Sequence, residues 1–188
     1  MVENYNEVLY DNEMLVTTRL ILRKFRKTDA SDIFEYGSDA ETLKYLDWGG
    51  VQTIDEALNS IVSYYWSRPG IFAIELKESK KCIGGIDLRL MPEHEKSGFG
   101  YVLNRKYWNK GYMTEALSAV LKLCFERLKL NRVEASYYVG NEGSGKVMMK
   151  CGMEFEGIGK QEVKNKGVFQ DTVRYGITKK QWALFDEE

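Results

Sequence analysis

Apolar and polar residues alternate in several short stretches of the chain, which is the pattern of β-strands with one buried face. The first stretch covers residues 15–25, where Leu20 and Leu22 share the face opposite Ile21. Further strands with this period are predicted at 71–77, 82–90, 98–103, 132–139 and on both sides of a turn at 165–167. The chain is therefore expected to build a sheet from many short strands.

Helical spacing of apolar residues predicts helices between these strands. They are expected at residues 28–37, 53–66, 114–128 and 144–152. In the second helix, Thr53 and Glu56 fit a capping box at the start. Its apolar stripe consists of Ala57, Leu58, Ile61, Val62 and Tyr65. The last helix is expected to stop at Gly152, a residue type that ends helices.

The order of these elements predicts an α/β (α+β) fold in which helices cover a mixed sheet. Residues 1–14 lack a regular period and are interpreted as an N-terminal arm, followed by a single domain at 15–188. A chain of 188 residues is long enough for one domain with a real core.

Composition narrows the class of protein. Hydrophobic residues make up 44% and charged residues 29%, values typical of soluble globular chains. The 27 Lys and Arg residues nearly balance the 28 Asp and Glu residues, so neither nucleic acid nor a membrane surface is expected as a partner. Three widely spaced cysteines are typical of reduced thiols. The sequence also shows no signal peptide and no long apolar segment. Together with the reduced cysteines, this predicts a cytoplasmic protein.

Metal chemistry finds little support in the residue spacing. The cysteines form no CxxC or Cys–His pattern, so no metal site is expected. His94, the only histidine, follows Pro92 and Glu93 and is expected to be exposed in a turn.

A first candidate for chemistry is the stretch 107–116, "YWNKGYMTEA". It precedes a predicted helix, whose first turn has unpaired N–H groups that attract anions. Gly111 would let the backbone approach such an anion closely, and Lys110 and Arg105 could add charge. The stretch matches neither the P-loop nor the dinucleotide fingerprint. Alone, it is at least as typical of an ordinary loop before a helix.

A second candidate is the stretch 141–157, "NEGSGKVMMKCGMEFEG". Asn141 follows a strand, and Ser144 stands near the start of a helix. Alone, this pattern is typical of a turn residue and an N-cap.

Four stretches taken together, in this order, resemble the GNAT superfamily of N-acyltransferases. They are "TTRLILRKFRKTDA" (17–30), "GYVLNRKYWNKGYMTEAL" (100–117), "NEGSGKVMMKCGMEFEG" (141–157) and "NKGVFQDTVRYGI" (165–177). The most similar subgroup contains the ribosomal-protein N-terminal acetyltransferases. The resemblance implies a central, mostly antiparallel sheet flanked by helices. It also implies that a bulge at 98–100 splays the strands.

The resemblance implies acetyl-CoA as co-substrate and names the residues that bind it. The pyrophosphate would lie on the backbone of Asn109, Lys110, Gly111, Tyr112, Met113 and Thr114. The pantetheine arm would run between the strand segments 101–103 (Tyr101, Val102, Leu103) and 135–139. Asn141 would hydrogen-bond this arm, and Ser144 would also contact the co-substrate. Asn109 occupies the place of the loop's usual first glycine.

Catalytic roles follow in the same way. Ser144 matches the position of a general acid that protonates the leaving thiolate, with a helix cap as the alternative role. A tyrosine found in related enzymes is replaced by Met148, which cannot donate a proton. Where many relatives carry a glutamate this chain has Gly98, so Glu134 is the candidate base, directly or through water. A solvated strand carboxylate is the alternative for Glu134, and a backbone N–H near Leu103 is the candidate oxyanion donor.

The predicted activity is transfer of an acetyl group from acetyl-CoA to a primary amine, by direct attack in a ternary complex. The acceptor is either a protein N-terminus or a small-molecule amine, and whether the chain forms a homodimer stays open. The aromatic residues Trp48, Tyr64, Tyr65 and Trp66 are expected in the core or in the wall of an acceptor pocket. The alternatives are an inactive acyl-CoA-binding sensor and a purely structural α/β protein.

Overall fold

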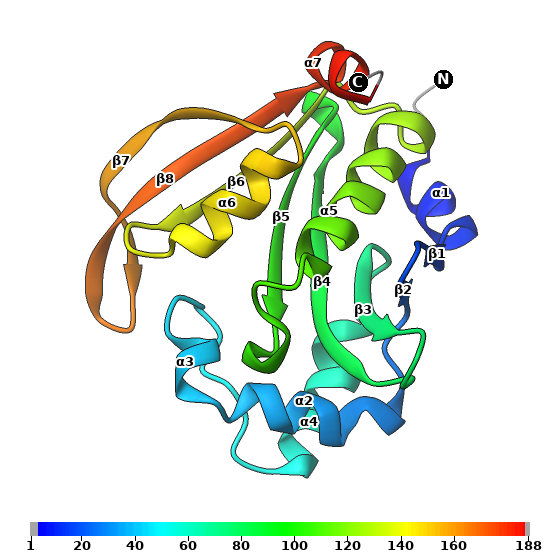
Figure 1. The fold of residues 1–188 in the computed structure, drawn as a ribbon, viewed down its shortest axis with the longest axis vertical. Helices are drawn as coiled ribbons and strands as arrows, with labels where there is room; N and C mark the ends of the chain where they lie inside the picture. The colour runs from blue at the N-terminus through cyan, green and yellow to red at the C-terminus, as the bar shows by residue number, and fades with distance from the viewer. Residues whose placement is uncertain (1–3, 187–188) are drawn as a thin grey trace.

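The alternating stretches form one eight-stranded sheet in the computed structural model, which describes residues 4–186 (Figure 1). The strand order is β1-β2-β3-β4-β5-β6-β8-β7, and every pair is antiparallel except β5 with β6. In chain order the strands are β1 Leu15–Val16, β2 Leu20–Arg23, β3 Ile71–Leu76, β4 Cys82–Met91, β5 Lys96–Leu103, β6 Arg132–Tyr138, β7 Glu154–Asn165 and β8 Val168–Thr178. The predicted mixed α/β class is confirmed.

Helices cover both faces of this sheet. They are α1 Tyr5–Asp11, α2 Ala30–Gly37, α3 Ala40–Leu43, α4 Ile54–Ser60, α5 Tyr112–Lys122, α6 Glu142–Lys150 and α7 Lys179–Asp186. Two of them continue into π-helical turns, α4 at Ile61–Tyr65 and α5 at Leu123–Arg127. Short 3-10 turns lie at Lys27–Asp29, Pro92–His94 and Arg105–Tyr107. Within residues 4–186, no helix has the length and apolar character needed to cross a membrane.

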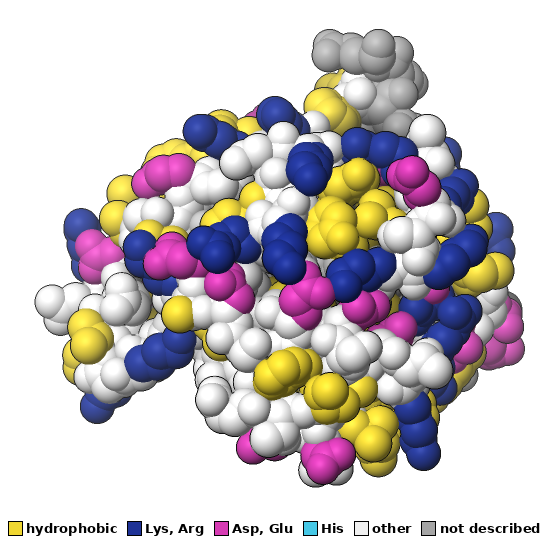
Figure 2. Space-filling model, turned by 60° about the horizontal axis from the view of Figure 1, so that its bottom comes forward, with side chains coloured by type: hydrophobic (Ala, Val, Ile, Leu, Met, Phe, Trp, Pro, Cys, Tyr) yellow, Lys and Arg dark blue, Asp and Glu magenta, His cyan; other side chains and the backbone are white. Residues whose placement is uncertain are grey.

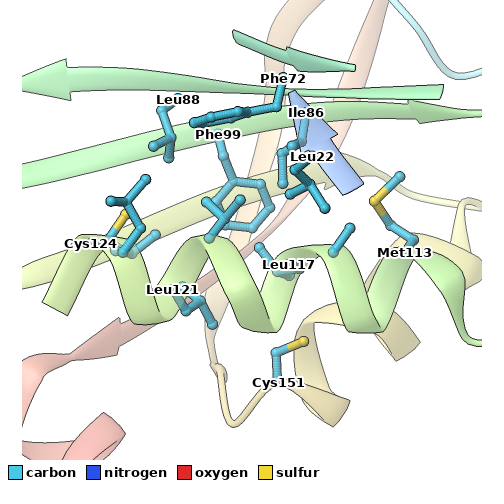
Figure 3. Packing of buried hydrophobic residues seen from close by; sticks show 14 of the residues in the cluster. Leu22, Phe72, Ile86, Leu88, Phe99, Met113, Leu117, Leu121, Cys124 and Cys151 are labelled. Carbon is cyan, nitrogen blue, oxygen red and sulfur yellow. The ribbon is translucent and has the colours of Figure 1, made fainter. Parts of the chain in front are cut away.

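Two clusters of buried side chains hold the layers together. The larger lies under α5, where Figure 3 shows Met113 and Cys124 directed toward the sheet residues Leu22, Ile86 and Leu88. Burial of such apolar surface is the main stabilising contribution to folding. The smaller cluster joins α2 and α4 to the other face of the sheet.

Several boundaries differ from the predicted ones for local reasons. The strand at 15–25 is divided by a turn in which the N–H of Thr17 bonds the carbonyl of Leu20. Val62 was expected on the buried stripe of α4 but is 51% exposed, because the π-turn adds a residue and rotates the stripe. Residues 5–11, in the predicted arm, form α1, and its Leu9 is buried in the larger cluster.

The last predicted helix begins earlier than expected, with Asn141 as its N-cap residue and Glu142 as its first residue. Ser144 therefore lies inside the first turn, and its expected alternative role as N-cap is wrong. The helix ends as predicted: Gly152 has a φ of +78°, and the N–H of Met153 bonds the carbonyl of Met148.

The sheet opens between β5 and β6. The two strands pair only from Lys96↔Arg132 to Gly98↔Glu134, after which β5 stays with β4 and β6 stays with β8. The pairing of β4 with β5 keeps a single register from Met91↔Lys96 to Gly84↔Leu103. The opening thus comes from the end of the β5–β6 pairing, in place of the predicted bulge at 98–100. Figure 1 shows the two strands diverging from there.

Candidate active site

A cleft of about 1350 Å³ occupies the space where the sheet opens. One wall is the end of β5, with Tyr101 and Val102, and the opposite wall is formed by β6 and β8. Ser144 and Met148 of α6 also line it. On the other side of the sheet, Gly98 and Gly100 form a glycine floor, and the Arg89 guanidinium lies beside Gly100. Seen from the lower end of the molecule, Lys and Arg side chains are interspersed with Asp and Glu side chains (Figure 2), so neither sign of charge dominates this side.

The loop after β5 has the backbone of an anion-binding turn. Asn109 has a φ of +58° and Gly111 a φ of +78°, and α5 begins directly afterwards at Tyr112. Asparagine tolerates this left-handed conformation better than most residues, which explains why it can stand in for glycine. The first N–H groups of α5 have no acceptor within the helix, so they and the helix dipole favour an anion here.

The side chains of the residues predicted to hold the pyrophosphate are placed in different surroundings. Met113 is buried in the core, so only its backbone can serve this site. The ammonium of Lys110 lies 5.4 Å from the centre of the Tyr107 ring. Tyr112 is covered by the guanidinium of Arg19, at 4.4 Å from the ring centre.

Asn141 and Ser144 are brought together at the start of α6. The amide Nδ2 of Asn141 donates to Ser144 Oγ at 3.0 Å, and the hydroxyl of Tyr101 donates to the Ser144 carbonyl at 3.2 Å. Burial raises the pKa of Tyr101, so its hydroxyl stays protonated and serves as a donor. The half-buried Ser144 lines the cleft. The start of α6 thus contacts Tyr101, near the end of β5, across the opening of the sheet.

Glu134 also lines the cleft, but its charge is already satisfied. Its carboxylate accepts from Lys96 Nζ at 2.8 Å and from Arg132 Nε at 2.9 Å. Partial burial raises the pKa of Glu134, yet the hydrogen bonds and charges of these two cations outweigh it, and the pKa is lowered overall. A carboxylate held in this way is a weak proton acceptor, whether the proton reaches it directly or through water.

Asp87 is a cleft residue that the sequence reasoning missed. It lies on β4 opposite Gly100, is 7% exposed, and accepts from the Tyr64 hydroxyl at 2.6 Å. Arg68 and Arg89 also donate to it. A lone aspartate within the apolar run of β4 was the available signal, because such a residue is rarely buried without a partner.

Other sequence candidates are placed as follows. Trp48, Tyr64 and Tyr65 line the cleft. Trp66 is not among the lining residues, and its Nε1 donates to the Phe25 carbonyl. The side chain of His94 is 64% exposed, as expected.

The cysteines and acidic groups give no sign of a metal centre. All three cysteines are buried and unpaired. Within the described residues, no group of three His, Cys, Asp or Glu side chains could hold a metal ion.

Comparison with known proteins identifies the family of the chain. Residues 19–154 match the model of the acetyltransferase (GNAT) domain. An uncharacterized N-acetyltransferase of Bacillus subtilis, YoaA, is 32% identical over 171 residues, which cover 88% of this chain and 97% of the relative. The ribosomal protein uS5-alanine N-acetyltransferase of Escherichia coli is 31% identical over 84 residues, 45% of this chain and 43% of that protein.

A solved structure extends the match to the whole fold. The crystal structure of a GNAT-family acetyltransferase from Bacillus anthracis superposes with a TM-score of 0.81 at 31% identity, covering 89% of this chain and 99% of that chain. The domain match contains the first motif (107–116) and residues 141–154 of the second, and a relative along nearly the whole chain is an N-acetyltransferase. The chain is an acetyltransferase and belongs to the GNAT domain family.

Proposed function

We propose that the enzyme transfers the acetyl group of acetyl-CoA to a primary amine, which attacks the thioester directly in a ternary complex. The observation that carries this proposal is the unpaired edge of β5 beyond Gly98. An extended substrate can add to such an edge as a further strand does. The pantetheine arm has the length and the amide groups for this, and the cleft gives it room.

The N–H of Leu103 is well placed to bind the thioester oxygen. The N–H of Asn104 bonds Ile83 on β4, so strand alternation turns the N–H of Leu103 the other way, into the opening. The Leu103 carbonyl already accepts from Trp108 Nε1 at 2.7 Å. This fixed N–H would stabilise charge that develops on the oxygen during attack.

Ser144 is proposed as the acid that protonates the departing thiolate of coenzyme A. Because Asn141 donates to Ser144 Oγ, the hydroxyl proton stays available for a group in the cleft. Glu134, held by Lys96 and Arg132, is proposed to take the proton of the amine through water. The acetyl carbon bonds to the amine nitrogen as the carbon–sulfur bond breaks and the departing sulfur takes the Ser144 proton; the proton taken by Glu134 then passes through water to restore the Ser144 hydroxyl.

The acceptor would enter from the side of the glycine floor. The aromatic rings of Trp48, Tyr64 and Tyr65 stand along this side of the cleft. Both a protein N-terminus and a small amine fit an open site of this kind. The Escherichia coli relative acts on an alanine of ribosomal protein uS5, which makes N-terminal peptides a reasonable first choice.

An acceptor screen tests the proposal. We expect acetyl-CoA to raise the melting temperature, and thiol release to begin when an N-terminal peptide or a small amine is added. A panel of both kinds would identify the acceptor. Tight binding without turnover across the panel would favour the acyl-CoA-binding sensor, and absence of binding would refute both functions.

A further inference from the structure

The turn between β1 and β2 is joined to the loop before α5 through one arginine. Arg19 Nε donates to Glu115 Oε2 at 2.6 Å, and Arg19 Nη1 donates to the Lys110 carbonyl at 2.9 Å. The backbone N–H of Arg19 also donates to Glu115 Oε1, at 2.7 Å. The guanidinium lies over the Tyr112 ring. Arg19 thus contacts both the Lys110 carbonyl in the loop and the first turn of α5, at Tyr112 and Glu115.

Glu115 is itself fixed from a second direction. The hydroxyl of Thr17 donates to Glu115 Oε1 at 2.6 Å, and Lys77 donates to the Thr17 carbonyl. Partial burial raises the pKa of Glu115, but the hydrogen bonds of Thr17 and Arg19 outweigh it, and the pKa is lowered overall. The carboxylate therefore stays charged and holds the guanidinium in place at neutral pH.

The contact to the Lys110 carbonyl has a consequence on the opposite side of the same peptide. In a trans peptide the C=O and the following N–H point in opposite directions. When Arg19 holds the Lys110 carbonyl, the N–H of Gly111 must point away from Arg19. Gly111 follows this peptide directly, and its left-handed φ of +78° is the rotation next to the peptide N–H, so the conformation of Gly111 is coupled to this peptide orientation.

We propose that Arg19 is a positioning residue for the pyrophosphate of acetyl-CoA, and that it acts by fixing the peptide between Lys110 and Gly111. This inference rests on the proposed function. It gives the "TTRL" motif a role that the cleft itself does not explain, since Arg19 bonds the loop directly at the Lys110 carbonyl, and Thr17 and Arg19 both bond Glu115 in the first turn of α5. Arg19 does not touch the reacting atoms.

The exposure of the Arg19 side chain separates this role from simple stability. The Arg19 side chain is 44% exposed, and ion pairs this close to solvent contribute little to the free energy of unfolding. The loop, by contrast, depends on one precise orientation to bind an anion. Removing Arg19 should therefore weaken donor binding much more than it lowers stability.

The test compares two acetyl donors in the Arg19→Ala variant. Acetyl-CoA carries the pyrophosphate, whereas S-acetylpantetheine lacks it. We expect Kd and KM for acetyl-CoA to rise about tenfold, the effect of losing one charge-assisted hydrogen bond. The kcat at saturating acetyl-CoA and the kcat/KM for S-acetylpantetheine should stay within about twofold of wild type.

Further variants confine the effect to the proposed contact. Glu115→Gln should weaken acetyl-CoA binding in the same way, and the double variant should add little, because both changes release the same carbonyl. Arg19→Lys should restore part of the affinity, since lysine can reach one acceptor but not two. The control variant Lys122→Ala removes an exposed cation from α5, the helix that contains Glu115. This variant should bind both donors as the wild type does.

The outcomes are distinct. An unchanged Kd for acetyl-CoA in Arg19→Ala would overturn the inference, as would an equal loss with both donors, which indicates general damage. Failure of the wild-type enzyme to bind acetyl-CoA at all would refute the proposed function itself. A loss confined to the pyrophosphate-bearing donor supports the positioning role.

Discussion

At the scale of single residues, the contacts that decide chemistry come from distant parts of the chain. The sequence predicts Ser144 and Glu134 as polar residues of the site, but their partners could not be predicted. Glu134 is held by Lys96 on a neighbouring strand, and Tyr101 reaches Ser144 across the opening of the sheet. Asp87 was missed for the same reason, because Tyr64 and Arg68 meet it only after folding.

Replacing Ser144 tests the proposed acid. Ser144→Ala removes the hydroxyl that would protonate the thiolate, and we expect kcat to fall about 100-fold, the usual size of a general-acid effect. The Kd for acetyl-CoA should change little. Ser136→Ala, which removes another hydroxyl of the cleft, serves as the control. A kcat equal to that of wild type would exclude the acid role.

The pH dependence tests the part played by Glu134. Partial burial raises its pKa, but the hydrogen bonds and charges of Lys96 and Arg132 lower this pKa overall, so Glu134 stays ionised and does not titrate in the neutral range. A rise in kcat/KM between about pH 6 and about pH 9 should then follow the loss of a proton from the ammonium form of the acceptor, because only the neutral amine attacks. Glu134→Gln should lower the rate without moving the midpoint of this rise. A shifted midpoint would show that Glu134 itself titrates there.

At the scale of elements, the sequence predicts whether a segment is a helix or a strand better than it predicts where that segment begins and ends. The helix at 114–128 was evident from its apolar residues, yet its start at Tyr112 depends on the left-handed Gly111. The earlier start of α6 was hidden because Ser144 is as good a cap as Asn141 by residue type. Helix α3 has only four residues, too few for a periodic signal.

Replacing Gly111 tests the turn before α5. Its φ of +78° is costly for a residue with a Cβ, and that atom would lie 3.3 Å from Arg19 Nη2. We expect Gly111→Ala to destabilise the fold by about 1 kcal/mol and to raise KM for acetyl-CoA several-fold. Gly49→Ala is the matched control, since a Cβ there meets nothing within 4 Å. Equal KM values in the two variants would contradict the role of the turn.

At the scale of the whole molecule, the opening of the sheet could not be predicted from periodicity. Alternation shows that 98–103 and 132–139 are strands, but it does not show that they pair at only three positions before they separate. The elements near the opening are also joined by side-chain contacts between residues distant in the chain. One polar cluster joins these parts: Glu35 of α2 accepts from Asn104, directly after β5, and pairs with Lys81 and Lys106.

This cluster predicts an acid-dependent stability of the whole fold. Hydrogen bonds from Lys106 and Lys81 lower the pKa of Glu35 to about 2. A lowered pKa stabilises the folded state above the unfolded value near 4.3, and the contribution is lost as the pH falls toward about 2. Allowing for solvent screening, it amounts to about 1–2 kcal/mol at neutral pH.

Urea unfolding of the wild type and of Glu35→Gln, at about pH 6 and about pH 3, measures this contribution. We expect the wild type to be the more stable at the higher pH, and the difference to shrink at the lower pH as Glu35 binds a proton. Glu126→Gln, which alters a pair within one exposed helical turn, should differ little from wild type at either pH. The difference in free energy of unfolding between the wild type and Glu35→Gln could instead stay constant or grow on acidification. That result would show that the Glu35 charge does not stabilise the contact between α2 and the end of β5.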